Sequence, residues 1–173
     1  MLKLSKALID YPIMSLRAGG QIATTINPII NPDNLKIVAW AVQDKFSKQT
    51  LYLLSQDIRE TLPLGFAVDD HDKLSLADDL IRLKDLLELN YSLFGKYVTT
   101  ENDKKLGKVT DYAVDIDSMI IKKIYCTKGL IKGFTAGETS IDRSQVIETT
   151  QTRVIAEDAT VKSREPKLNP AGA

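Results

Sequence analysis

The sequence predicts a mainly β fold in which a small β-rich unit occurs twice, with one α-helix between the two copies. Three observations support this prediction. Short β-prone runs, separated by turns rich in Asn, Asp, Pro and Gly, fill most of the 173 residues. Only residues 75–90 have apolar side chains at helical spacing. Residue types of the first half recur in the second half at a nearly constant separation.

The first β-prone runs lie on either side of Asn31–Asn34, which has the sequence Asn-Pro-Asp-Asn. Proline fixes φ, and Asn and Asp side chains hydrogen-bond to the nearby backbone, so this segment predicts a turn between two strands. Pro28 and Pro32 lack a backbone donor, which places the first of these strands at a sheet edge or at a bulge. Residues 51–60 and 65–70 predict further short strands.

Residues 75–90 predict a helix of about four turns. Ser75 is suited to the N-cap, with Asp78 three residues later as in a capping box. Asn90 is suited to the left-handed conformation that ends many helices. We expect the apolar stripe to be buried on one or both β units or on a second subunit. Its members are Leu76, Leu80, Ile81, Leu83, Leu86 and Leu87.

After the helix, two β-prone runs meet near Asp115 and Asp117. Side chains two apart in a strand point the same way, so this pair could hold a hard cation. However, Ca²⁺ takes six to eight oxygen ligands, and no further run of ligands follows here. Asn31 and Asp33 occupy the matched positions of the first copy. The sequence therefore predicts a hairpin turn at this point, not a metal site.

The repeat sets the domain boundaries that we expect. A shift of 84 positions places Ile30–Leu35 on Val114–Met119, and a shift of 88 places Asp57–Thr61 on Gln145–Thr149. The four extra residues of the second copy fall in or near residues 127–139, a loop-like insert. The predicted division is a first domain at 1–74, a connecting helix at 75–90, a second domain at 91–158 and a flexible tail at 159–173.

Both copies resemble the PRC-barrel family, small β-barrel domains named after the photosynthetic reaction centre. The resemblance rests on residues 14–40 and 93–124, where Ile22-Ala23 and Leu106-Gly107 occupy the aliphatic–small pair of the family pattern. The first copy departs from the pattern, since Ala23 replaces glycine. The resemblance implies two small PRC-like β-barrels joined by the helix. It also implies a protein-contacting role, because the barrel has no catalytic role in the family members considered.

The composition argues against some classes of function and indicates the cellular compartment. Lys plus Arg equals Asp plus Glu at 23 each, whereas a nucleic-acid binder usually has a basic excess or a basic face. The single cysteine, Cys126, allows no disulfide within the chain and fits a reducing compartment. The sequence contains neither a signal peptide nor an apolar run of membrane-spanning length. We therefore expect a cytoplasmic protein without membrane insertion.

Few residues are candidates for chemistry, and we predict no catalytic, cofactor-binding or metal-binding residue. His71 lies among acidic residues that could make it a base, but it has no nearby nucleophile motif and is interpreted as an exposed loop residue. Cys126 is interpreted as a small buried hydrophobe. Trp40 is interpreted as a core side chain, with an interface anchor as the alternative.

The insert is the predicted contact loop. Gly129, Gly133 and Gly137 recur every four residues, but charged residues interrupt the spacing, so it does not indicate membrane-helix packing. Loops of this kind often carry contacts, and the lysines could touch an anionic partner. The candidate contact residues are Lys128, Gly129, Lys132, Gly133, Phe134 and Gly137.

The leading hypothesis is a non-enzymatic adaptor that binds a protein partner. A maturation factor for the small ribosomal subunit is an alternative, because that factor has a similar length and two barrels. Its glycine-rich N-terminal signature is absent from this sequence. A small-ligand binder, using His71 or a barrel cavity, is a further alternative. The last alternative is a self-associating structural protein, that is, a homo-oligomer paired through exposed strand edges.

Overall fold

The computed structural model describes residues 1–131, 134–135 and 137–158, and the fold is mainly β, as predicted. The predicted tail at 159–173 lies outside the described residues. The strands of the first half are β1 (Leu2–Leu4), β2 (Pro12–Ser15), β3 (Gly20–Asn31), β4 (Lys36–Asp44), β5 (Thr50–Leu54), β6 (Ile58–Leu62), β7 (Gly65–Val68) and β8 (Leu74–Ser75). The helix α1 (Lys84–Leu89) follows, and then β9 (Tyr97–Thr100), β10 (Lys105–Asp115), β11 (Ile120–Thr127), β12 (Leu130–Ile131), β13 (Phe134–Thr135), β14 (Thr139–Asp142), β15 (Val146–Thr149) and β16 (Arg153–Ala156).

The two halves have the same strand order. In the first half the order is β6-β7-β2-β3-β4-β5, and in the second it is β15-β16-β9-β10-β11-β14. Each half has one parallel pair at the same place, β2 with β7 and β9 with β16, and antiparallel pairs elsewhere. The additional hairpin, β12–β13, lies between β11 and β14, within the predicted insert. This shared order agrees with the repeat deduced from residue types.

The sheet of each half is open in the described residues. Three-residue 3-10 turns, Ser55–Asp57 and Arg143–Gln145, join β5 to β6 and β14 to β15. These strands stand at opposite ends of their half's order, and no ladder between described residues pairs them. Hydrogen bonding therefore does not close either half into a barrel, and the two-barrel description stays a prediction.

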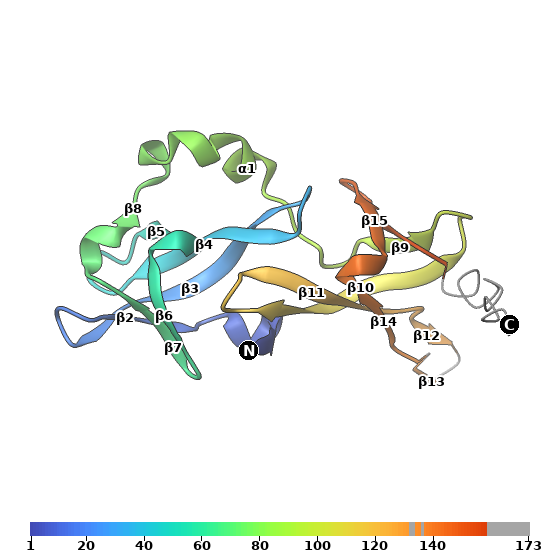
Figure 1. The fold of residues 1–173 in the computed structure, drawn as a ribbon, viewed down its shortest axis with the longest axis horizontal. Coiled ribbons are helices and arrows are strands. Elements are labelled where there is room, and N and C mark those ends of the chain that lie inside the picture. The colour runs from blue at the N-terminus through green and yellow to red at the C-terminus, as the bar shows by residue number, and fades with distance from the viewer. Residues whose placement is uncertain (132–133, 136, 159–173) are drawn as a thin grey trace, which may run out of the picture.

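The two halves meet at the tips of matching hairpins, where β4 and β11 belong to one continuous sheet. The Ile37 N–H donates to the Met119 carbonyl at 2.8 Å, and the Ile121 N–H donates to the Leu35 carbonyl at 2.9 Å. Leu35 and Met119 are both buried and both have positive φ, 54° and 56°. Like an isologous dimer contact, the junction uses the same positions of each half. Figure 1 shows the halves side by side along the long axis.

The N-terminal strand lies in the sheet of the second half. β1 pairs antiparallel with β10, with Leu2 opposite Asp115 and Leu4 opposite Ala113. Directly after β1, the Ser5 hydroxyl donates to Asp111 Oδ1 at 2.5 Å, and both residues are buried. One hydrophobic cluster contains buried side chains from both halves. The packing of the second half therefore depends on residues from the start of the chain.

The predicted four-turn helix at 75–90 is wrong in length. Ser75 pairs with Tyr52 in the β8–β5 ladder, so it is not a helix cap. Two 3-10 turns follow, Ala77–Asp79 and Ile81–Leu83, and only Lys84–Leu89 is α-helical. The 3-10 turn has three residues per turn, so side chains placed at 3.6-residue spacing do not stay on one face.

The burial expected for the helical stripe is correspondingly incomplete. Leu80 is buried, but Leu76 is 52% exposed and Ile81 is 81% exposed. The predicted end of the helix is confirmed, because Asn90 has left-handed angles of φ 45° and ψ 51°. None of the helices in the described part of the chain is long and apolar enough to cross a membrane.

We predict that Ser5→Ala lowers the free energy of unfolding by about 1–3 kcal/mol, because the buried Asp111 carboxylate loses one of its donors. Urea denaturation measures the change. Ser92→Ala is the matched control, since Ser92 is exposed, and we expect a change within about 0.5 kcal/mol. Equal effects of the two substitutions would show that the Ser5–Asp111 contact does not fasten the N-terminal segment.

Candidate functional site

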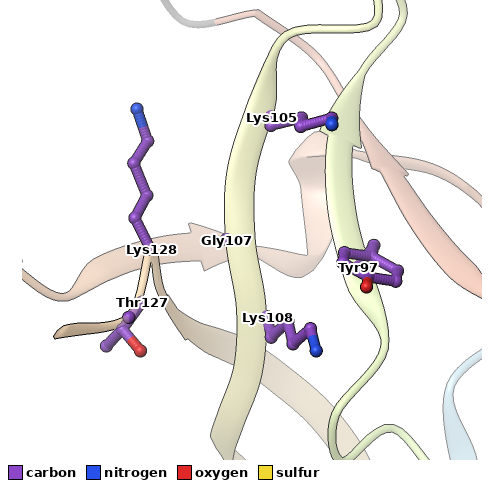
Figure 2. A pocket seen from close by; sticks show the side chains of 7 residues that line it. Tyr97, Lys105, Gly107, Lys108, Thr127 and Lys128 are labelled. Atoms are coloured by element: carbon purple, nitrogen blue, oxygen red, sulfur yellow. The ribbon is translucent and has the colours of Figure 1, made fainter. Parts of the chain in front are cut away.

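A pocket of about 600 Å³ opens where β11 ends and the chain turns into the insert. We call it the lysine cleft. Figure 2 shows Lys105 and Lys108 of β10 on the side of Tyr97, with Gly107 between them along the strand and Lys128 on the other side of β10. The lining residues are Tyr97, Lys105, Gly107, Lys108, Thr127, Lys128 and Gly129.

Strand register and one bulge position these side chains. Lys108 stands opposite Tyr97 of β9 on one side and opposite Thr127 of β11 on the other. The β9–β10 ladder shifts register between Lys105 and Gly107, and a bulge of this kind re-aims side chains. Gly107 has φ 133°, and a Cβ at this position would lie 2.3 Å from the Thr127 carbonyl oxygen. Only glycine allows the end of β11 to approach β10 this closely.

The rim of the cleft is positively charged and its wall is mostly carbon. The Lys108 Nζ lies 4.8 Å from the centroid of the Tyr97 ring, a cation–π distance. Tyr97 is 54% exposed. Lys105, Lys108 and Lys128 are exposed, and none of them forms an ion pair with another described residue. The cleft can therefore bind an anionic group beside an apolar one.

The predicted contact loop overlaps this cleft only in part. Lys128 and Gly129 line it. Gly137 is exposed but is not among the lining residues. Phe134 is the first residue of β13 and is not among them either. The remaining two candidates, Lys132 and Gly133, lie outside the described residues.

The sequence prediction missed Tyr97, Lys105 and Lys108. The available signal was the close spacing of two lysines around Gly107 in one β-prone run. Tyr97 could be found only from the pairing of β9 with β10.

The hairpin predicted at Asp115 and Asp117 is confirmed, because the segment between β10 and β11 is a turn. The two carboxylates do lie together, and they bind the Met1 ammonium. The distances are 3.0 Å to Asp115 Oδ1 and 2.7 Å to Asp117 Oδ2. Asp117 also accepts a hydrogen bond from the Thr61 hydroxyl. Within the described ranges, no group of three or more His, Cys, Asp or Glu side chains could hold a metal ion.

His71 lies between β7 and β8, but it is paired and only half-exposed. Its Nε2 lies 2.7 Å from Asp44 Oδ1, and the Asp44 side chain is 3% exposed. Ser47 donates to the other carboxylate oxygen through its hydroxyl at 2.6 Å and its N–H at 2.9 Å. Because the Ser47 hydroxyl donates to Asp44, His71 does not activate it as a nucleophile. The contact fastens the β4–β5 turn to the β7–β8 loop.

This contact also sets the charge state of Asp44. Burial by itself would raise the pKa of the Asp44 carboxyl group. The hydrogen bonds from Ser47 and His71 together outweigh burial and lower that pKa to about 2. Residue spacing carries no local signal for the pair, because Asp44 ends β4 and His71 lies between β7 and β8.

The other two candidates are core residues, as predicted. Cys126 has no exposed surface, and burial raises the pKa of its thiol to about 11. Trp40 is 1% exposed and packs against Phe66, with ring centroids 5.7 Å apart. A thiol with this pKa is not a nucleophile at neutral pH.

No protein-family model matches the chain, and no curated protein matches it significantly. The resemblance to the PRC-barrel family therefore stays a prediction.

We predict that Gly107→Ala destabilises the fold by about 1–3 kcal/mol, because its Cβ would meet the Thr127 carbonyl and its φ is unfavourable for alanine. Thermal unfolding and urea denaturation measure the loss. The control is Gly20→Ala, where a Cβ meets no atom within 4 Å. A Gly107→Ala variant as stable as the control would contradict the close approach of β11 to β10.

We predict that Asp44→Asn is less stable than the wild type by about 1–3 kcal/mol at neutral pH. The folded-state pKa of Asp44 is lowered, so its carboxylate stabilises the fold above the unfolded pKa of about 3.9, and this contribution is lost as the pH falls through about 2. The difference between variant and wild type should therefore shrink between about pH 4 and about pH 2.

Denaturation across this pH range measures the difference. Asp72→Asn, which removes the same charge from an exposed position, serves as the control. A difference that stays constant down to about pH 2 would contradict the assignment to Asp44.

Proposed function

We propose that this protein is a non-enzymatic adaptor that binds another protein through the lysine cleft. The observation that carries the proposal is the cleft itself, which is lined by three exposed lysines without ion pairs to described residues and by the half-exposed ring of Tyr97. Tyrosine and an apolar wall supply contact area, and charges at the rim supply specificity and association rate.

The chemistry of the described side chains favours binding over catalysis. The chain has one histidine, and its contact with Asp44 joins the end of β4 to the β7–β8 loop. The hydroxyl of Ser47 donates to Asp44, so it is not positioned for attack on a substrate. The Cys126 thiol is buried and protonated at neutral pH. Each of the three residues therefore has a structural role that accounts for it.

The repeated strand order supports a tandem PRC-barrel as the finer description of the fold. The pairs Ile22-Ala23 and Leu106-Gly107, which carry the resemblance, fall in the corresponding strands β3 and β10. The PRC-barrel resemblance implies a protein-contacting role, and the lysine cleft is in keeping with it. The cleft forms in the second copy, next to the insert that the first copy lacks. A cytoplasmic protein is part of the proposal, because a lone cysteine fits a reducing compartment.

Photo-crosslinking tests the proposal. We expect Tyr97→p-benzoylphenylalanine, expressed in the native host, to form a discrete protein adduct that survives nuclease treatment. Phe46→p-benzoylphenylalanine is the matched control, since Phe46 is an aromatic residue of the first half and is 68% exposed. Mass spectrometry identifies the adducts. Adducts with RNA alone, or the same proteins at both positions, would overturn the proposal and favour the ribosomal or non-specific alternative.

A further inference from the structure

Two acidic residues of the second half form ion pairs with basic residues outside the lysine cleft. Asp142 pairs with Lys123 at 3.7 Å, and Asp103 pairs with Arg153 at 3.6 Å. The three cleft lysines have no such partner among the described residues. No ion pair between described residues therefore engages the cleft lysines, and an acidic ligand is their electrostatic complement.

The cleft has room for more than a single anion. Its volume of about 600 Å³ lies in the range of pockets that hold drug-sized ligands. Gly107 and Gly129 contribute no side chain to it, and the lysine stems and the Tyr97 ring supply carbon surface. An inorganic ion would leave this surface exposed, whereas a short peptide segment would cover it.

The aromatic ring distinguishes a peptide from a nucleic acid. Single-stranded nucleic acids bind by stacking their bases on free aromatic faces. One face of Tyr97 is already occupied by the Lys108 ammonium at 4.8 Å. A carboxylate can pair with this ammonium without displacing it from the ring. The net charge of zero also lacks the basic excess typical of nucleic-acid binding.

We infer that the lysine cleft binds an acidic segment of the partner protein, in which carboxylates flank an apolar side chain. This inference rests on the proposed function and names the chemistry that the partner must present. The carboxylates pair with Lys105, Lys108 and Lys128, and the apolar side chain packs against Tyr97 and the lysine stems.

The test uses the full chain and three labelled probes. The acidic probe is a fluorescein-labelled Glu-Glu-Leu-Glu-Glu peptide, its neutral match is Gln-Gln-Leu-Gln-Gln, and the third is a labelled oligouridylate. Fluorescence anisotropy measures binding at about 50 mM and about 150 mM salt. We expect the acidic peptide to bind most tightly of the three probes, and we expect its affinity to fall with added salt. Equal binding of the neutral peptide, or tighter binding of the oligouridylate, would overturn the inference.

Charge-matched variants locate the binding. We expect the triple variant Lys105→Gln/Lys108→Gln/Lys128→Gln to bind the acidic peptide about tenfold more weakly, because three exposed ion pairs are lost. The control, Lys45→Gln/Lys48→Gln/Lys122→Gln, removes the same charge from exposed positions that do not line the cleft. Thermal melting verifies that both variants are folded. Equal weakening by both variants would show that net charge alone attracts the peptide, which overturns the inference.

The two proposals can fail separately. A specific protein adduct at Tyr97, together with no binding of the acidic peptide, would overturn this inference and leave the adaptor function in place. The absence of any specific protein adduct would overturn the adaptor function. Binding of the acidic peptide by the wild type but not by the cleft variant supports the inference.

Discussion

Two backbone hydrogen bonds between matching hairpin tips hold the halves of this protein in one sheet. Each bond runs from an isoleucine N–H, at Ile37 or Ile121, to the carbonyl of the buried residue at the tip of the other hairpin. The tips can meet because Leu35 and Met119 adopt positive φ, which turns their carbonyls toward the opposite strand. Around this junction the core is continuous, and the strand order of one half repeats in the other. The junction lies at the start of β11, the strand that pairs with β10 and whose last residue, Thr127, lines the lysine cleft.

Local turn chemistry made much of the fold predictable from sequence. The turns at Asn31–Asn34 in the first copy and at Asp115–Asp117 in the second follow from side chains that bond the nearby backbone, as Asn31 does to the Asp33 N–H. The long helix could not be predicted correctly, because its first residue, Ser75, pairs with Tyr52 in the β8–β5 ladder. A non-local strand partner thus overrode a helical pattern that is favourable when considered alone.

The difference between local and non-local contacts also explains which residues of the candidate site were predictable. Lys128 and Gly129 belong to the glycine-rich insert, which is visible in the sequence as a loop. Tyr97 and Lys108 are neighbours only across a strand pair, and Asp44 and His71 meet only after the end of β4 and the β7–β8 loop have come together. Neither pair has a signature in residue spacing. A single sequence reports local conformation well, whereas the sites of this protein are built from contacts between segments.

The pairing of β1 with β10 has a consequence for how the chain is made. Leu2–Leu4 is translated more than a hundred residues before its partner residues, Ala113–Asp115. At typical bacterial and eukaryotic translation rates this delay is on the order of ten seconds. During that interval the nascent first half carries a strand whose backbone lacks its native neighbour. The unpaired backbone groups of this strand must therefore avoid other strand partners until β10 has been made.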